Sequence, residues 1–399
     1  MTRIFVKLVS MNKQVPTTHQ AKHSNGPRTA TFTREAMAGL GIAIAIILGS
    51  LAATRSFSFG SDAIVESTNV IVAEPADPNK VMGNNACVKC HASEQAVWAA
   101  TPHAKTFDEL HRRPEASQIA SKLGISSIKH GDRCVACHYT RQADPSSVTT
   151  VSTNGSSLPD FHAIAGISCE SCHGAARDWL EAHHDYGGPN GTRLTESPAH
   201  REQRIARSVE LGMRNPYNVY LVAQSCYRCH TTGDEELVNV GGHPTGSLDF
   251  ELVAWSQGKV HHNFVRTDGK ENVISSPHRL RFLFVAGVIA ETESTLRALS
   301  TATEKATYAL TVAKRAARAG ARLKSVADKV NDERLDLAVG VFDSVKIKLN
   351  NRKNLVSAAD QLAQIGIEFA DAETKSTEKE LHEKLITLDR FIPAPTNWK

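Results

Sequence analysis

The sequence has no strong excess of charge of either sign and no long basic run. Its 46 lysines and arginines are balanced by 42 aspartates and glutamates, so the formal net charge is only +4. A protein that binds nucleic acid concentrates its basic residues on one face or in one run, because contacts with phosphates supply most of the affinity. We therefore exclude nucleic acid as a partner.

No cysteine stands outside one repeated pattern. The eight cysteines form pairs three positions apart, and a histidine directly follows each pair. A disulfide framework would not repeat this spacing, and CxxC bridges seldom occur four in a row. The four pentapeptides are Cys87-Val-Lys-Cys90-His91, Cys134-Val-Ala-Cys137-His138, Cys169-Glu-Ser-Cys172-His173 and Cys226-Tyr-Arg-Cys229-His230.

Each pentapeptide is a complete attachment unit for haem c. The two cysteines can form thioether bonds with both vinyl groups, and the histidine can coordinate the iron. A zinc site can also use CxxC pairs, but it does not require a histidine after each second cysteine. The pattern therefore predicts four covalently bound haem c groups, whose irons have His91, His138, His173 and His230 as their proximal ligands.

The N-terminal region combines basic residues with an uncharged apolar stretch. Arg3, Lys7 and Arg34 are among the basic residues that precede Ala36 to Ala53, which contain no charge. An apolar stretch of roughly 18 residues is short for a spanning helix. We therefore interpret residues 1–53 as a signal peptide or an N-terminal membrane anchor. The positive-inside rule then predicts a periplasmic protein, soluble after cleavage or tethered to the inner membrane.

The rest of the chain divides by composition. Residues 54–82 are predicted to be a linker, since Pro75 and Pro78 interrupt any helix. Residues 83–279 contain every cysteine but few long periodic apolar segments, so haem would supply the missing apolar mass. Residues 280–392 contain no cysteine, and no proline occurs between Pro277 and Pro393. This composition predicts an α-helical bundle at 280–392, followed by a tail at 393–399. The expected fold is mainly α, with few strands.

Apolar residues within 280–392 recur at helical spacing. We expect one helix face made of Leu335, Ala338, Phe342, Val345 and Leu349, and another made of Leu355, Ala358, Leu362, Ile365 and Phe369. A turn is expected at Asn350 to Asn354. Thr377 and Glu380 have the spacing of a capping box before a last helix. Such a bundle usually serves packing or homo-oligomerisation, and we assign it no chemistry.

The second axial ligand decides between a carrier and an enzyme, because iron with two histidine ligands transfers electrons whereas an open iron can bind a substrate. Local context favours His103, which lies at an expected helix start, and His243, which follows two glycines in a tight turn. Two doublets, His183 with His184 and His261 with His262, lie in segments that contain tryptophan. The residues alone do not choose within either doublet.

At these residues the sequence resembles the tetrahaem cytochrome c family typified by the electron acceptor of hydroxylamine oxidoreductase in ammonia-oxidising bacteria. The resemblance covers roughly 83–264. It rests on the Cys87 motif with the segment Trp98 to Phe107, on Gly166 to Gly174, and on Trp255 to Phe264. It implies closely packed haems with mostly bis-histidine ligation. It suggests His103, His183, His243 and His262 as the distal ligands.

The leading hypothesis is a periplasmic respiratory electron-transfer protein that carries four haems and exchanges electrons with redox partner proteins. One alternative is a multihaem reductase or oxidase that acts on a small nitrogen or sulfur compound at one open haem. Another is a membrane-anchored, quinol-oxidising tetrahaem cytochrome. An enzymatic role is thus left open, with the carrier preferred and no catalytic residue assigned.

Overall fold

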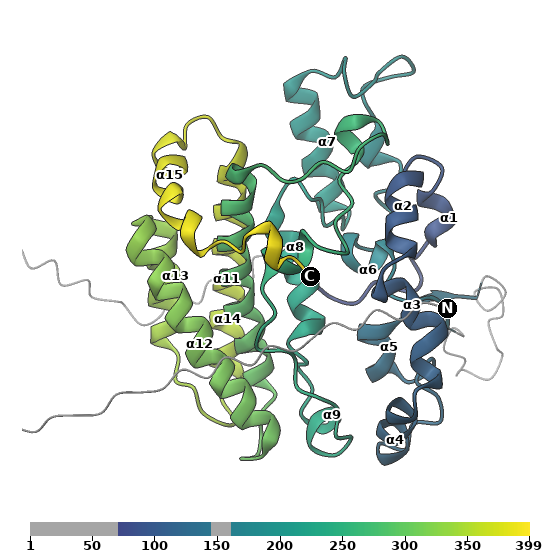
Figure 1. Ribbon diagram of the computed structural model, residues 1–399, viewed down its shortest axis with the longest axis vertical. Coiled ribbons are helices and arrows are strands. Elements are labelled where there is room, and N and C mark those ends of the chain that lie inside the picture. Colours follow the sequence, from purple (N-terminus) through teal and green to yellow (C-terminus); the bar gives the residue numbers. More distant parts are fainter. Residues whose placement is uncertain (1–70, 145–160) are drawn as a thin grey trace, which may run out of the picture. The chain divides into compact units, whose positions relative to one another are not determined.

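A computed structural model describes residues 71–144 and 161–399. The predicted signal peptide or anchor, 1–53, and most of the predicted linker lie outside these residues. The expectation of a mainly α fold is confirmed, because helices predominate and the strands form a single two-stranded sheet in the described residues (Figure 1). Within the same residues, no helix combines the length and the apolar character needed to cross a membrane.

Short helices make up the part of the chain that contains the cysteine motifs. They are α1 (Asn84–Cys87), α2 (Ala92–Ala99), α3 (Pro102–Glu109), α4 (Pro114–Lys122), α5 (Asp132–His138), α6 (Cys169–His173), α7 (Pro198–Glu210), α8 (Val219–His230), α9 (Glu235–Asn239) and α10 (Leu252–Ser256). Strand β1 (Thr140–Ala143) pairs antiparallel with β2 (Phe161–Ala165), with an irregularity after Thr140. This hairpin joins the second motif to the third.

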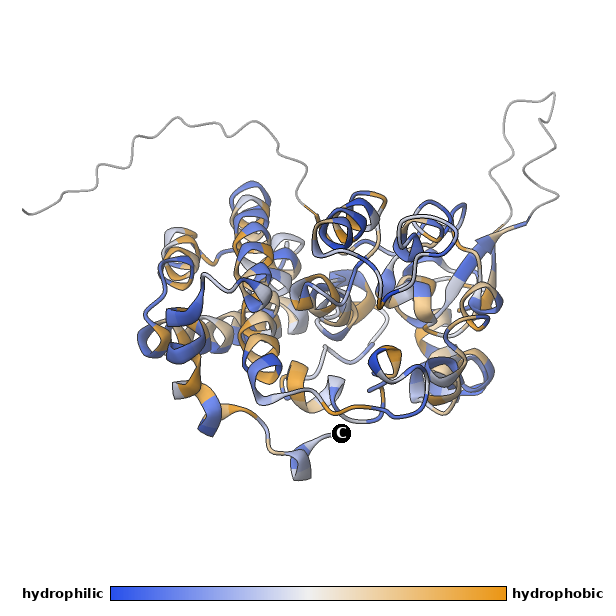
Figure 2. Cartoon of the chain, turned by 90° about the horizontal axis from the view of Figure 1, so that it is seen from above, coloured by the Kyte–Doolittle hydropathy of each residue, from blue (hydrophilic) through white to orange (hydrophobic). Residues whose placement is uncertain are grey.

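Long helices form the remainder. They are α11 (Pro277–Ser300), α12 (Thr307–Val330), α13 (Glu333–Ser344), α14 (Arg352–Asp371) and the short α15 (Lys379–Lys384). Helix α11 begins where Pro277 occupies the first turn and the Ser276 hydroxyl accepts a hydrogen bond from the Arg279 N–H at 3.3 Å. Buried apolar residues of α11, α12 and α14 form one core. Figure 2 shows that hydrophobic and hydrophilic residues alternate along the helices of the chain.

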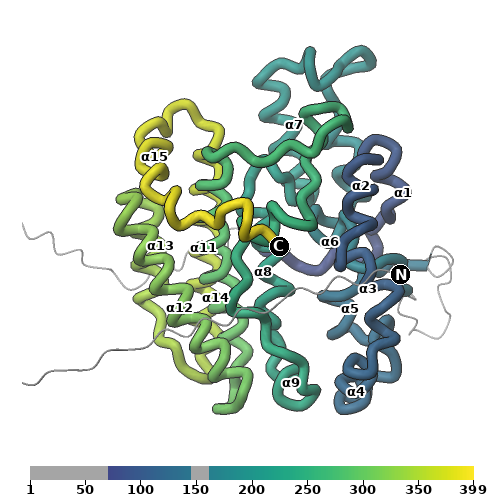
Figure 3. Tube along the Cα trace, viewed as in Figure 1, coloured from purple at the N-terminus to yellow at the C-terminus, as the bar shows by residue number. Residues whose placement is uncertain are grey.

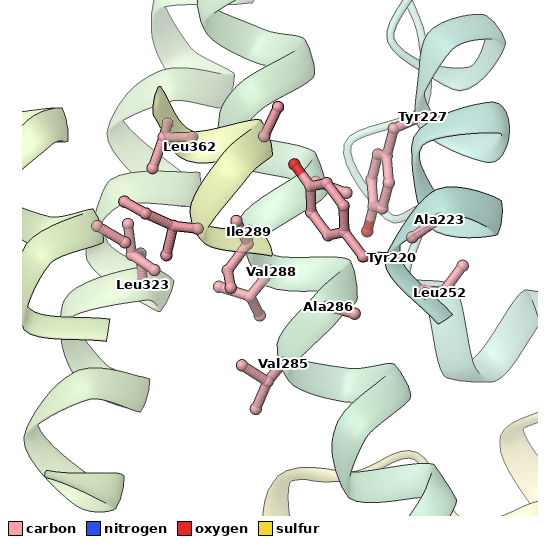
Figure 4. Close-up of a cluster of buried hydrophobic side chains, with 14 of the residues drawn as sticks. Tyr220, Ala223, Tyr227, Leu252, Val285, Ala286, Val288, Ile289, Leu323 and Leu362 are labelled. Carbon is pink, nitrogen blue, oxygen red and sulfur yellow. The ribbon is translucent and has the colours of Figure 1, made fainter. Parts of the chain in front are cut away.

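One apolar core joins the long helices to the helix of the fourth motif. Tyr220 and Tyr227 of α8 are fully buried against α11, together with Leu252 (Figure 4). The core near the second motif is much smaller and is built around Cys134, Val135 and Tyr139. All described residues belong to one compact unit. The division at residue 279 therefore remains a prediction about independent folding.

Two details of the helical prediction are wrong. The helix that carries Leu335 and Ala338 ends at Ser344, because Val345 is extended, and Leu349 lies in the connection to α14. There the Asn350 N–H donates to the Ala302 carbonyl at 3.2 Å. The second stripe is confirmed, since all five of its residues lie buried in α14.

The predicted capping box at Thr377 and Glu380 is also wrong. The N-cap residue of α15 is Glu378, and no side chain caps this helix. The Glu378 N–H instead donates to the Lys375 carbonyl at 3.1 Å, so a tight turn delays the start of the helix by one residue. Leu381, Leu385 and Leu388 are buried, as their spacing predicts.

The C-terminal tail packs against α10 and the segment that follows it. Figure 3 shows the yellow tail running from α15 to the C-terminus. The Lys399 N–H donates to the Ala254 carbonyl at 2.9 Å, and the Lys399 carbonyl accepts from the Lys259 N–H at 2.8 Å. The tail therefore lies beside the segment that leads to His262.

Candidate functional site: four cysteine motifs and their histidines

The four motifs occupy different local structures. The first runs from the last residue of α1 to His91, the N-cap of α2, the second ends α5, the third forms α6, and the fourth ends α8. In α6 the Ser168 and Ser171 side chains cap each other's backbone in a capping box. All eight cysteines are free thiols in the structure, and Cys90 is the exposed one.

Each motif histidine lies opposite one histidine from outside the motifs. The ring centroids are 6.4 Å apart for His91 and His183, and 6.1 Å apart for His138 and His243. They are 6.2 Å apart for His173 and His262, and 6.3 Å apart for His230 and His103. The structure thus brings together all eight histidines that sequence and resemblance select, in four pairs of nearly equal separation.

Backbone carbonyls hold the Nδ1 atoms of three of the four histidines that face a motif histidine, and the Leu180 oxygen also lies 2.8 Å from Nδ1 of His184. Nδ1 of His243 lies 2.7 Å from the Pro244 oxygen, that of His262 lies 2.6 Å from the Val260 oxygen, and that of His183 contacts the Leu180 oxygen. An Nδ1–H that donates to a carbonyl leaves Nε2 unprotonated and able to coordinate a metal. These contacts therefore orient the rings and select the tautomer.

The geometry separates the members of each doublet. His183 faces His91, whereas His184 is 47% exposed at its side chain and lies 3.8 Å from the Glu181 carboxylate. His262 faces His173, whereas Nε2 of the neighbouring His261 is buried without a hydrogen-bond partner. The arrangement favours His183 and His262.

Burial keeps three of the motif histidines neutral. Desolvation lowers the pKa of His138, His173 and His230 to about 4 in each case. The same cause lowers the pKa of His103 and His183. A neutral imidazole is the form that binds iron, so these rings are poised to act as ligands near neutral pH.

Hydrogen bonds between the motifs show which of them are neighbours. Glu170 of the third motif accepts from the Gly83 N–H, just before the first motif, at 2.8 Å. The Ser225 hydroxyl, just before the fourth motif, donates to the Cys172 carbonyl of the third at 2.9 Å. Arg228 of the fourth motif donates to the Ala136 carbonyl of the second at 2.7 Å. The motifs therefore follow one another in space in the order first, third, fourth, second.

A carboxylate inside the third motif fastens the first motif to it. Glu170 is 1% exposed, and its two oxygens accept backbone N–H groups from Met82 at 2.9 Å, Gly83 at 2.8 Å and Ala176 at 2.8 Å. This residue was not singled out by the sequence analysis. Its position between the two cysteines was visible, but its burial depends on a segment 87 residues earlier.

Arginines that the sequence analysis did not select also support the site. Arg204 binds both oxygens of Glu196, at 2.7 and 2.8 Å, and donates to the His183 carbonyl at 2.6 Å. Arg214 is 8% exposed and donates to the carbonyls of Glu74 and Ser171. No motif marks either arginine, because its partners are distant in sequence.

The residues fit covalently attached haem. Two imidazoles on one iron place their ring centroids about 6 Å apart, since each metal–nitrogen bond is about 2 Å long. All four pairs have this separation, and each has two free thiols close by in sequence. A cavity of about 620 Å³ also opens between α2 and the Lys259 to Phe264 segment, lined partly by Ala96, Val97 and Phe264.

Residues 86–174 match the family described as "Cytochrome c554 and c-prime". The chain is 28% identical to "Cytochrome c-554" of Nitrosomonas europaea over 107 residues, which is 26% of this chain. The matched region spans 43% of that relative's length. No solved structure matches the chain. The part of the chain that is similar to c-type cytochromes thus holds the first three of the four cysteine motifs.

Proposed function

We propose that this chain is a periplasmic tetrahaem cytochrome c that relays single electrons between redox partner proteins. Each motif would hold one haem through its two cysteines. The axial pairs would be His91 with His183, His138 with His243, His173 with His262, and His230 with His103. Each haem iron would supply a reversible one-electron couple, and the protein would supply its position, ligands and surroundings.

The observation that carries this proposal is the presence of four histidine pairs separated by 6.1 to 6.4 Å. Each pair joins one motif histidine to one from outside the motifs, so each iron would have two axial imidazoles. Iron with both axial positions filled exchanges electrons and cannot bind a substrate. The four pairs therefore support the carrier rather than an enzyme that needs an open iron.

The order of the motifs supports a relay through the chain. Hydrogen bonds link the first motif to the third, the third to the fourth, and the fourth to the second. The first and second motifs would then be the two ends of the relay. Cys90 of the first motif is exposed, and the His91 side chain is 39% exposed, so this end is accessible to a partner.

The test compares histidine variants of the purified, haem-loaded protein. We expect a pyridine haemochrome assay to return four haems per chain in all of them, because losing an imidazole leaves the thioether bonds intact. His183→Ala should convert one low-spin haem to high spin, whereas His184→Ala should leave the spectrum unchanged. His262→Ala and His261→Ala form a second matched pair.

The opposite result within a doublet would show that the wrong neighbour was chosen. Fewer than about three haems in the wild-type protein would contradict the assignment of the motifs. A low-spin spectrum in both variants of a doublet would remove that pair as axial ligands, and the enzyme with an open haem would then become the better hypothesis.

A further inference from the structure

A cluster of buried ionisable side chains lies between the fourth motif and the long helices. We call Tyr227, Glu251, Glu291, Arg315 and Arg322 the Glu291 cluster. Glu291 of α11 is fully buried, and Arg315 of α12 is 1% exposed. Tyr227 of α8, in the fourth motif, is fully buried on the side of α8 that faces α11 (Figure 4).

The hydrogen bonding of this cluster is incomplete. Arg322 donates to Oε2 of Glu291 at 2.7 Å, but Nη1 of Arg315 is 3.7 Å from Oε1, too far for a hydrogen bond. Four buried polar atoms of this cluster have no hydrogen-bond partner: Glu291 Oε1, Arg315 Nη1, Glu251 Oε1 and the Tyr227 hydroxyl. Such atoms are rare in native proteins, because each costs the desolvation energy of its group.

The cluster is connected to the proximal side of the fourth motif. Nη2 of Arg315 donates to the carbonyls of Gly246 at 2.6 Å and Ser247 at 2.8 Å. Gly246 packs directly on the backbone carbonyl of His230. The Phe250 ring stacks on the His230 ring with centroids 4.1 Å apart and meets the Tyr227 ring edge-on at 5.0 Å. One residue later comes Glu251.

We propose that Glu291, with Glu251 beside it, is a proton-binding site whose occupancy is coupled to the oxidation state of the haem held by Cys226, Cys229 and His230. The proposal rests on the proposed function. A partner that donates one electron reduces the iron from the ferric to the ferrous state. The Glu291 carboxylate takes one proton from water and becomes a carboxylic acid. When the electron passes to an acceptor, the proton returns to water.

The charges around Glu291 explain why this carboxylate would respond. Arg315, Arg318 and Arg322 face it from α12 and favour the ionised form, while Tyr227 faces it from α8 and Glu251 from the residue before α10. Burial outweighs the arginines and raises the pKa of Glu291. Burial also raises the pKa of Glu251. An added negative charge nearby strengthens proton binding, since charges interact strongly in a weakly polarisable interior.

The same helix supplies a matched control. Glu293 is 2% exposed, but its oxygens accept hydrogen bonds from the Tyr220 hydroxyl at 2.6 Å, Gln224 Nε2 at 3.0 Å and Arg297 Nε at 2.8 Å. Both of its oxygens thus accept hydrogen bonds, unlike Oε1 of Glu291. Glu293→Gln therefore tests whether losing any buried carboxylate of α11 has the same effect.

The experiment is a spectroelectrochemical titration of the full haem-loaded protein across about pH 5 to 9. The wild type should show four redox components, and we expect the midpoint potential of one of them to fall with rising pH. The slope should reach up to about 59 mV per pH unit, the value for one proton per electron. This slope should disappear in Glu291→Gln and remain in Glu293→Gln. The proposal would be overturned if all four midpoint potentials of the wild type were independent of pH. It would also be overturned if the potential of Glu291→Gln changed with pH as steeply as that of the wild type.

Two further measurements keep the outcomes distinct. If Glu291→Gln does not load haem, the reduced-minus-oxidised infrared spectrum of the wild type decides. It should show a protonated carboxyl band that appears on reduction and shifts in D₂O, and its absence would overturn the proton site. A haemochrome assay on the same wild-type samples separates the two proposals: fewer than about three haems per chain contradicts the proposed function, whereas about four haems with no pH dependence contradicts only the proton coupling.

Discussion

Replacing Glu170 should destabilise the contact between the first and third motifs. The carboxylate accepts three backbone N–H groups in a buried position, two of them from Met82 and Gly83 just before Cys87. Each N–H left buried without an acceptor lowers the free energy of unfolding by about 1–3 kcal/mol. For three such groups, Glu170→Ala would lower it by at most about 3–9 kcal/mol. Water can reach the partly exposed Met82. We therefore expect a loss of about 3–5 kcal/mol.

Glu170→Gln should cost less, about 1–3 kcal/mol, because the amide keeps one acceptor oxygen but turns its NH₂ group toward a backbone donor. The assay is guanidinium unfolding of the haem-loaded protein, followed by circular dichroism. Glu181→Gln serves as the control, since that side chain is 91% exposed and should change the stability by less than about 0.5 kcal/mol. A loss below about 1 kcal/mol for Glu170→Ala would refute the reasoning.

Two further predictions concern a charge network and the helical segment. Arg204 lowers the pKa of Glu196 to about 2, below the unfolded value of about 4.3, so the stabilisation from this carboxylate should be lost as the pH falls between these values. In urea unfolding, the difference between wild type and Glu196→Gln should therefore be smaller at about pH 3 than at about pH 6, and an equal difference would contradict this. Residues 280–388 expressed alone should be helical by circular dichroism, because their apolar stripes pack mostly on one another. A disordered spectrum, even at high concentration, would show that the segment folds only against α8.

The local parts of the structure were predictable from the sequence. The cysteine motifs were recognised from spacing alone, and the stripe from Leu355 to Phe369 was read correctly because a helix face repeats every three to four residues. The end of α13 was missed. There a hydrogen bond between Asn350 and Ala302, 48 residues earlier, accompanies the turn, and periodicity carries no information about such distant partners.

The pairing of the histidines could not be derived from the residues. His183 lies 92 positions after the histidine it faces, and His103 lies 127 positions before its own. Local context selected candidates and the resemblance chose among them, but only the folded chain shows which ring faces which motif. Glu170 and Arg204 were missed for the same reason, because their partners come from other segments.

The central claim is that four irons each have two histidine ligands. Low-temperature electron paramagnetic resonance of the oxidised, haem-loaded protein tests it most directly, with the haem content measured on the same sample. The account predicts signals from about four low-spin ferric haems per chain and no high-spin signal. A high-spin signal equivalent to about one iron per chain would contradict it, because one of the four histidine pairs would then not be an axial pair.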